Sequence, residues 1–315
     1  MIWIIGAGSM AREYVKVLQA LELPCRVIGR SEARARQLAD DTGVDVVAGG
    51  LAPFLQSAPD VAGHAIVCTP VDQLATVSRM LMQYGVKSLL VEKPAAIDNG
   101  ELQQLIDTAD ESGAKVKVGY NRRFYQSVIA MEGLIEADGG LSGCHFEVTE
   151  WGHRVVDAPS SAPVKQKWLL ANTTHVIDLA FFETGLPAEL SSFTSGSLDW
   201  HRSAARFCGA GIADGGALLS YMGYWDGPGR WALEFVTRRN RYILSPLERL
   251  KVQKIGEIAV AEVPGVDYSL DDNFKPGLYL QTRDFVTGAG ERLCDLHHLQ
   301  KAFPFYLQIA AYDPA

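Results

Sequence analysis

The sequence predicts an α/β fold, in which an N-terminal doubly wound parallel sheet is followed by a C-terminal α+β domain with a large, mostly antiparallel open sheet. Short apolar runs alternate with helical patterns over the first 120 residues, and a glycine-rich turn follows the first run. After residue 190 the pattern changes to strand-like runs separated by turns. The length of 315 residues favours two domains, which we expect at 1–120 and 121–315, with the last helix free to pack back on the first domain.

The apolar runs of the first domain are rich in valine and isoleucine and show little polar alternation, as strands buried on both faces of a parallel sheet do. Between the first two runs, apolar residues from Met10 to Leu21 fall at helical spacing, and Glu101 to Ser112 forms a second helical pattern that stops at Gly113. The expected strands are Ile2–Ile5, Cys25–Ile28, Val44–Val47, Ala65–Cys68, Ser88–Val91 and Lys115–Val118.

The second domain mixes helices with strands that alternate between polar and apolar residues. A normal stop signal, Gly185-Leu186-Pro187, ends its central helix. The expected elements are a helix at 127–136, a half-exposed strand at 144–149, a loop at 152–167, a helix at 168–184, several strands between 190 and 263, and closing helices at 274–287 and 296–312.

Charge and cysteine content exclude several classes of protein. The net charge of -8 comes without a basic block, so we expect no nucleic-acid partner. The five cysteines are dispersed and form no CxxC pair, which argues against a disulfide framework or a zinc site and favours a reducing compartment. The first apolar run is too short for a signal peptide, and no stretch approaches the length of a membrane span. We therefore expect a cytoplasmic protein with no membrane partner and no metal.

The turn after the first strand reads Gly6-Ala7-Gly8-Ser9-Met10-Ala11. Gly6 allows a tight turn, Gly8 lets the backbone approach a pyrophosphate, and the small Ala11 lets helix and strand pack closely. Ser9 and Met10 open the helix whose N-terminus would face the anion. This pattern predicts a Rossmann domain that binds a dinucleotide. A similar triplet at 209–211 has no helical stripe behind it and is expected to lie in a sheet.

The end of the second strand bears on the choice of cofactor. Arg30 and Ser31 stand where NAD enzymes often carry an acidic residue that binds the ribose hydroxyls. An arginine there suits the 2′-phosphate of NADP, and the serine could donate a hydrogen bond, so we expect NADP, with NAD as the other possibility. The alternative is that Arg30 is a solvated loop charge and that Glu32 takes the ribose.

A lysine follows another apolar strand, in the run Glu92-Lys93-Pro94. Ligands of such sheets bind at the carboxyl ends of the strands. A lysine placed there can hold a substrate hydroxyl and stabilise negative charge on its oxygen. The alternative is a surface lysine before a turn proline.

The sequence at this point resembles the glucose–fructose oxidoreductase and inositol dehydrogenase family (Gfo/Idh/MocA). The resemblance covers roughly the first 60% of the chain. The motifs that carry it, in order, are the Gly6–Ala11 turn, Thr69-Pro70, Glu92-Lys93-Pro94, Gly119-Tyr120-Asn121-Arg122-Arg123-Phe124 and His175-Val176-Ile177-Asp178. The family implies a nicotinamide cofactor, a sugar, polyol or related substrate, and an open sheet that commonly serves contacts in a homo-oligomer such as a dimer or tetramer.

The resemblance also implies roles for single residues. Lys93 matches the catalytic lysine, and His175 matches the general acid/base, which suits a side chain that titrates near neutral pH. Thr69 and Pro70 match a loop on the cofactor side, where Glu92 and Lys93 also belong. The segment Tyr120, Asn121 and Arg122 matches a hinge that lines the substrate site. The family often has a cis peptide before the proline that matches Pro94.

The histidine helix departs from the family pattern. An aspartate usually stands three or four residues before the histidine, but those positions hold Asn172 and Ala171, which cannot ionise. Asn172, His175 and Asp178 share roughly one side of the helix, with Trp168 close to the same stripe. We expect Asn172 to orient substrate or imidazole. Trp168 and Asp178 are substrate-side candidates, although Asp178 could equally be a helix residue behind the site.

These residues predict a dehydrogenase or reductase that moves a hydride between nicotinamide and a sugar, polyol or nucleotide-sugar carbon. In this hypothesis His175 takes the hydroxyl proton and Lys93 stabilises the alkoxide. The missing aspartate leaves an alternative open, a nucleotide-binding sensor or regulator of the same fold that has lost turnover. No motif names the substrate.

Overall fold

The computed structural model describes residues 1–201, 203–288 and 290–313. It forms two compact units. Unit 1 comprises Met1–Asn121 and Asn273–Gln300, and unit 2 comprises Arg122–Asp272 and Lys301–Pro314. The sequence predicts a continuous second domain from residue 121 onward, whereas in the structure the segment Asn273–Gln300 groups with unit 1.

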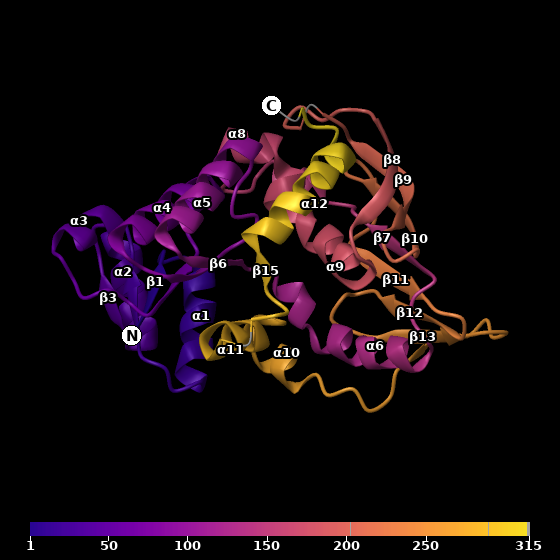
Figure 1. Ribbon diagram of the computed structural model, residues 1–315, viewed down its shortest axis with the longest axis horizontal. Helices are drawn as coiled ribbons and strands as arrows, with labels where there is room; N and C mark the ends of the chain where they lie inside the picture. Colours follow the sequence, from indigo (N-terminus) through magenta and orange to yellow (C-terminus); the bar gives the residue numbers. More distant parts are fainter. Residues whose placement is uncertain (202, 289, 314–315) are drawn as a thin grey trace. The chain divides into compact units, whose positions relative to one another are not determined.

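Unit 1 contains a seven-stranded sheet in the order β15-β6-β5-β4-β1-β2-β3 (Figure 1). Strands β1 to β6 are parallel and β15 is antiparallel to β6, so the order around β1 is that of a doubly wound dinucleotide-binding sheet. The strands are β1 (Ile2–Ile5), β2 (Cys25–Ile28), β3 (Asp45–Val47), β4 (His64–Val67), β5 (Ser88–Val91), β6 (Lys115–Val118) and β15 (Cys294–Asp295).

Helix α5 of unit 1 begins and ends at capping residues. Asp98 accepts a hydrogen bond from the backbone N–H of Glu101 at the start of α5, and Gly113 ends that helix in the left-handed conformation. The helices of unit 1 are α1 (Ser9–Ala20), α2 (Glu32–Thr42), α3 (Leu51–Gln56), η1 (Val71–Gln73), α4 (Leu74–Tyr84), α5 (Asn99–Ser112) and α11 (Leu278–Thr287); α12 (Leu296–Ala310) begins here and ends in unit 2.

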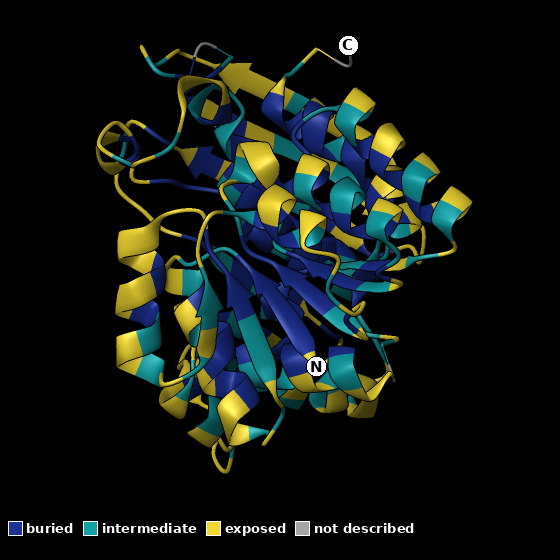
Figure 2. Cartoon of the chain, turned by 90° about the vertical axis from the view of Figure 1, so that its left-hand side faces the viewer, coloured by how far each residue is buried: buried dark blue, intermediate teal, exposed yellow. Residues whose placement is uncertain are grey.

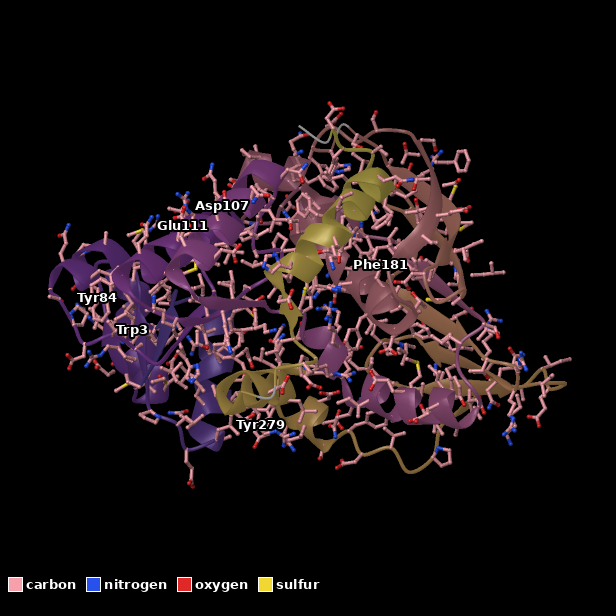
Figure 3. The ribbon with its side chains drawn as sticks, viewed as in Figure 1. Trp3, Tyr84, Asp107, Glu111, Phe181 and Tyr279 are labelled. Atoms are coloured by element: carbon pink, nitrogen blue, oxygen red, sulfur yellow. The ribbon has the colours of Figure 1, made fainter. Side chains whose placement is uncertain are left out.

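The central strands of this sheet are buried on both faces, as Figure 2 shows. All four residues of β1 are buried, including Trp3, whose ring meets Phe54 edge-on at 5.0 Å and lies 6.2 Å from the ring of Tyr84 (Figure 3). This burial explains why the strand sequences lack polar alternation.

Unit 2 is built on an eight-stranded sheet in the order β14-β13-β12-β11-β7-β10-β9-β8. Each neighbouring pair is antiparallel except β7 and β10, which are parallel. The strands are β7 (Gly143–Glu147), β8 (Pro187–Ser195), β9 (Arg206–Ala213), β10 (Leu218–Tyr224), β11 (Ala232–Val236), β12 (Asn240–Leu244), β13 (Lys251–Lys254) and β14 (Ala261–Glu262). The predicted fold class, a doubly wound sheet plus a mostly antiparallel one, is confirmed.

One face of this second sheet carries the core of unit 2. Phe146 on β7 stacks on Tyr221 of β10 at 5.3 Å and meets Phe181 edge-on at 6.3 Å. Phe181, labelled in Figure 3, also stacks on Tyr306 at 6.0 Å. The helices of unit 2 are η2 (Asn121–Phe124), α6 (Gln126–Ala137), α7 (Gly152–Val155), α8 (Ala162–Gln166), η3 (Leu169–Thr173), α9 (Thr174–Thr184) and α10 (Ser269–Asn273).

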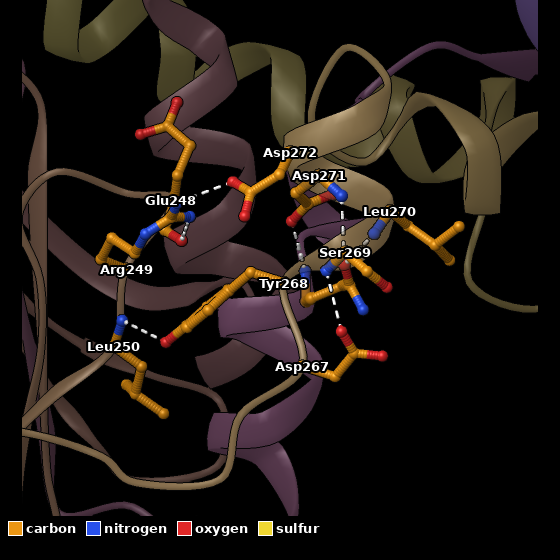
Figure 4. Close-up of polar contacts among 10 residues, drawn as sticks. Glu248, Arg249, Leu250, Asp267, Tyr268, Ser269, Leu270, Asp271 and Asp272 are labelled. Carbon is orange, nitrogen blue, oxygen red and sulfur yellow. Dashed lines mark hydrogen bonds and ion pairs between the residues drawn. The ribbon is translucent and has the colours of Figure 1, made fainter.

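The short helix α10 is held by side chains rather than by its own length (Figure 4). Asp271 accepts a hydrogen bond from the backbone N–H of Gln126, and Asp272 pairs with Arg249 at 2.7 Å. Tyr268 accepts a hydrogen bond from the backbone N–H of Leu250 at 3.1 Å. These contacts fix the chain just before it enters the segment that belongs to unit 1.

Two expected elements differ from the structure. The segment 152–167 is not a continuous loop, because α7 and α8 form within it, the latter with Pro163 in its first turn, where proline is tolerated. The segment 168–184 is not one regular helix, because Leu169–Thr173 form a π-turn before α9.

The triplet Gly209-Ala210-Gly211 lies in β9, as predicted. Any side chain on Gly209 would collide with Ser191 of β8 and the ring of Tyr221, so close strand approach explains this glycine. Among the described residues, no helix has the length and apolar character needed to cross a membrane.

Candidate functional site

The residues predicted to bind the cofactor lie at the carboxyl edge of the parallel sheet of unit 1. The direction of strand succession reverses between β1 and β4, which is where ligands of doubly wound sheets bind. Gly6 follows β1, Arg30 follows β2, Thr69 follows β4 and Lys93 follows β5. Backbone hydrogen bonds between the strand ends hold these loops together, including Gly6 N–H to Ile28 O at 2.9 Å and Glu92 N–H to Val67 O at 2.8 Å.

The turn after β1 has the geometry that its glycines predict. Gly6 has a φ of +122°, and a Cβ there would lie 2.7 Å from the backbone oxygen of Cys68, so only glycine fits. A Cβ on Gly8 would meet nothing within 4 Å. Gly8 and Ser9 are exposed, and no side chain caps the first turn of α1. The uncapped N–H groups and the open space above the turn suit a pyrophosphate.

The loop after β4 adds one buried polar atom on the same edge. Thr69 lies two residues after the end of β4, and its Oγ1 is buried without a hydrogen-bond partner among the described residues. Pro70 beside it is exposed and precedes the turn η1. Because buried hydroxyls in native proteins are normally satisfied, this atom fits a site that a ligand completes. Together with the glycine turn, it makes unit 1 suited to a dinucleotide.

The loop after β2 leaves one guanidinium available. Arg30 is exposed, and within the described part of the chain no hydrogen bond or ion pair engages it. Glu32, the alternative ribose ligand, pairs with Arg36 at 2.8 Å on the exposed side of α2. The hydroxyl of Ser31 accepts a hydrogen bond from the backbone N–H of Arg34 as the N-cap of that helix. The guanidinium of Arg30 could therefore bind a 2′-phosphate without first breaking a contact that the structure describes.

The loop after β5 carries the Glu92-Lys93-Pro94 motif. The Lys93–Pro94 peptide bond is cis, which confirms the expectation from the family resemblance. Glu92 accepts a hydrogen bond from the hydroxyl of Tyr14 on α1 at 2.7 Å. Burial, and then the Glu92 carboxylate, raise the pKa of Tyr14 well above its ordinary value, so the phenol stays protonated and donates. Tyr14 thereby fixes the residue that precedes Lys93.

The segment after β6 crosses the boundary between the units. Tyr120 and Asn121 belong to unit 1, and Arg122 begins unit 2. The side chain of Asn121 donates to the backbone oxygen of Pro276 at 2.8 Å. The side-chain oxygen of Gln281 on α11, in the orientation that satisfies its neighbours, accepts from the backbone N–H groups of Tyr120 and Asn121. The segment 273–300 therefore supports this part of the predicted hinge.

In unit 2, His175 lies in the first turn of α9, directly after the π-turn. The backbone N–H of Thr174 bonds to the oxygen of Leu169, five residues earlier, which widens the helix at this point. His175 is 6% exposed. Two residues of the π-turn, Asn172 and Thr173, donate hydrogen bonds to Oε1 of Glu150 at 2.8 and 2.7 Å.

The ring of His175 lies near Trp231, whose ring is also contacted by two arginines. Its centroid lies 6.1 Å from that of Trp231. The guanidinium groups of Arg122 and Arg230 lie 4.9 and 4.4 Å from the Trp231 ring. Burial raises the pKa of the neighbouring Tyr125 to about 12, although the charge of Arg122 opposes this shift. The histidine therefore lies beside a buried tryptophan that two guanidinium groups also contact.

The other two substrate-side candidates of this helix contact protein groups. Both carboxylate oxygens of Asp178 accept from Arg123, at 2.5 and 2.8 Å, and the two side chains are 1% and 4% exposed. The ring of Trp168 meets Trp200 edge-on at 6.5 Å, and its Nε1 is buried without a partner among the described residues. For Asp178, these contacts favour the alternative of a helix residue behind the site.

Several residues of these two regions carry no sequence signal. Tyr14 reads as one member of an apolar stripe, and Gln281 and Trp231 fall outside every motif. Glu150 follows a strand and lies 22 residues before Asn172, so spacing alone could not connect them. The sequence around it, Glu147-Val148-Thr149-Glu150-Trp151, does not single it out either.

Comparison with known proteins agrees with the geometry of unit 1. Residues 1–120 match the Gfo/Idh/MocA family, described as "Oxidoreductase family, NAD-binding Rossmann fold". The chain is 25% identical over 192 residues to inositol 2-dehydrogenase of Rhizobium meliloti (strain 1021). That alignment covers 58% of this chain and 54% of the relative, so the chain matches about half the length of this curated relative.

Solved structures share the fold of the whole chain. UDP-N-acetylglucosamine 3-dehydrogenase from Acidithiobacillus ferrooxidans has a TM-score of 0.73 at 16% identity, with 99% of this chain and 97% of that chain covered. An oxidoreductase from Agrobacterium radiobacter, solved with NAD+, L-tartaric acid and magnesium, has a TM-score of 0.78 at 15% identity, with 99% and 94% covered. The match over residues 1–120 confirms the resemblance read from the motifs: this part of the chain is similar to the Gfo/Idh/MocA oxidoreductase family.

Proposed function

We propose that the protein is an NADP-dependent dehydrogenase or reductase that acts on a CH–OH carbon of a sugar, polyol or nucleotide-linked sugar. The observation that carries the proposal is the grouping of Gly6, Thr69 and Lys93 in loops at the carboxyl edge of a doubly wound sheet. The relatives described above include dehydrogenases of inositol and of UDP-N-acetylglucosamine, which supports this substrate class.

In this proposal the glycine turn and the uncapped start of α1 hold the pyrophosphate, with Ser9, Met10, Thr69 and Pro70 beside it. When bound, the nicotinamide supplies hydride chemistry. The ammonium of Lys93 stabilises negative charge on the substrate oxygen, and His175 takes or returns the hydroxyl proton. Tyr120, Asn121, Arg122 and Trp168 contribute to substrate binding, and Asn172 positions the turn that precedes His175.

Turnover is the direct test of this proposal. We expect NADPH oxidation with a keto-sugar, or NADP reduction with a sugar or polyol, when the purified protein is assayed spectrophotometrically against a panel of such compounds. The absence of a carboxylate at Asn172 favours one other function, a nucleotide-binding sensor. Tight nucleotide binding with no turnover across the panel would support the sensor.

The choice between cofactors depends on Arg30. We expect Arg30→Ala to weaken NADP binding by about tenfold to a hundredfold, because a charge-assisted contact to the 2′-phosphate contributes roughly 1.5–3 kcal/mol. The affinity for NAD should change little. Titrations of both nucleotides by intrinsic fluorescence measure this, with Arg36→Ala, at an exposed arginine of α2, as the control. Equal losses for NADP and NAD would show that Arg30 does not read the 2′-phosphate.

We also propose that the protein forms a homo-oligomer through the open face of the second sheet. Phe193, Cys208 and Met222 are paired across β8, β9 and β10 and are all exposed, and Leu218 farther along β10 is 62% exposed. Apolar rows of this kind mark interaction surfaces. We expect Met222→Glu with Leu218→Glu to lower the mass measured by light scattering to that of a monomer. An unchanged mass would place the contact elsewhere.

We also propose a cytoplasmic location, which the dispersed, unpaired cysteines support.

A further inference from the structure

Glu150 is a buried carboxylate that no motif accounts for. Its side chain is 3% exposed and lies three residues beyond the end of β7. Oε1 accepts hydrogen bonds from the Asn172 amide and the Thr173 hydroxyl, and Oε2 lies 3.3 Å from Arg230. A buried carboxylate is costly unless it is paired, so a position that keeps one has a reason to do so.

The residues that Glu150 holds belong to the π-turn immediately before His175. The family resemblance implies an aspartate three or four residues before His175, where this chain has Asn172 and Ala171, and Asn172 lies about one helical turn from His175. Its amide donates to Glu150 at 2.8 Å, which brings a negative charge next to the position that lacks one. Single π-turns occur frequently at functional sites. In this one, the consecutive residues Asn172 and Thr173 both donate hydrogen bonds to Glu150.

A second path connects Glu150 to the same histidine. Glu150 pairs with Arg230, the Arg230 guanidinium lies 4.4 Å from the ring of Trp231, and the Trp231 ring lies 6.1 Å from that of His175. Within unit 2, two chains of contacts therefore lead from Glu150 to His175. One runs through Arg230 and Trp231, and the other runs through Asn172 and the helix backbone. Glu150 is thus connected to the residues before His175 and to the ring beside it.

The described charged groups on the elements that carry these contacts come from four places in unit 2. Asp178, on the same helix as His175, is paired with Arg123. Arg122 follows β6 and Arg230 precedes β11, and both guanidinium groups lie over the ring of Trp231. Glu150, beyond β7, is the carboxylate that pairs with Arg230.

We propose that Glu150 is a positioning residue that replaces, from another element of the fold, the carboxylate missing at Asn172. It stabilises the protonated form of His175 and holds the π-turn that places the ring. The inference rests on the proposed function only for the assignment of His175 as the proton-transfer group.

The test follows the His175 titration directly, so it needs no substrate. The histidine Cε1–H signals are recorded by NMR from pH 5 to 9, and His175→Gln assigns the resonance. Glu150→Gln keeps the shape and the Oε1 acceptor but removes the charge, and we expect the midpoint of the His175 titration to fall by about one pH unit. Adding Asn172→Asp to Glu150→Gln returns a carboxylate to the helix and should restore the midpoint.

Two further variants complete the test. Arg230→Gln, at a side chain that is 47% exposed, leaves Glu150 uncompensated and should move the midpoint upward, opposite to Glu150→Gln. Glu189→Gln removes the same charge from an exposed position on β8 and should change nothing. The proposal is overturned if the midpoint is unchanged in Glu150→Gln and in Arg230→Gln, or if the double variant fails to restore it. Absence of turnover in the wild type, with the midpoints shifted as expected, would instead contradict the proposed function and leave the role of Glu150 standing.

Discussion

Replacing Lys93 with alanine is expected to lower kcat by about a hundredfold to a thousandfold, the cost of removing one charge-stabilising donor from an oxyanion. Lys93 follows β5 at the carboxyl edge of the sheet, beside Glu92, which Tyr14 holds at 2.7 Å. The loss should appear in kcat more than in the affinity for nucleotide, because the ammonium interacts most strongly with charge that develops during reaction. Single-turnover rates with NADPH measure the chemical step.

Lys115→Ala provides a matched control. Lys115 is exposed at the start of β6, on the opposite edge of the same sheet. Replacing it removes one positive charge, as Lys93→Ala does, but leaves the loops after β1, β4 and β5 unchanged. A kcat for Lys93→Ala within threefold of the wild type, with intact folding by circular dichroism, would contradict the role of Lys93. So would an equal loss in Lys115→Ala.

The first unit could be read from sequence because its signals are local. Strands buried on both faces appear as unbroken apolar runs, and a turn that requires a φ of +122° requires glycine. Four of the expected strands match the structure to the residue: β1, β2, β5 and β6. The loops after the strands follow from the parallel topology, so the positions of Thr69 and Lys93 at one edge could be anticipated.

The second unit was harder to predict because its determinants lie far apart in the chain. The helices α7 and α8 are four and five residues long and include a glycine and a proline, so no helical period could reveal them. Asn172 and Thr173 in the π-turn before His175 both donate hydrogen bonds to Glu150, which is more than twenty residues away in the chain. Tertiary contacts of this kind leave no spacing pattern in the sequence.

The pair Arg123–Asp178 should have the largest effect on stability. Both side chains are almost completely buried, and the carboxylate accepts two hydrogen bonds from the guanidinium. Asp178→Ala leaves a buried arginine without this carboxylate and should destabilise the folded protein by about 3–5 kcal/mol. Urea unfolding followed by tryptophan fluorescence reports mainly on unit 2, since Trp3 belongs to unit 1 and the other five tryptophans to unit 2.

Removing both charges separates the cost of a stranded arginine from the value of the pair itself. Arg123→Met combined with Asp178→Leu should recover most of the stability, because apolar pairs of similar volume replace buried ion pairs at little cost. Glu234→Gln, which breaks a pair with the partly exposed Arg241, should change stability by less than about 1 kcal/mol. An unchanged unfolding midpoint in Asp178→Ala, together with weaker substrate binding, would contradict this prediction. Asp178 would then contribute to substrate binding, and its ion pair with Arg123 would not stabilise the fold.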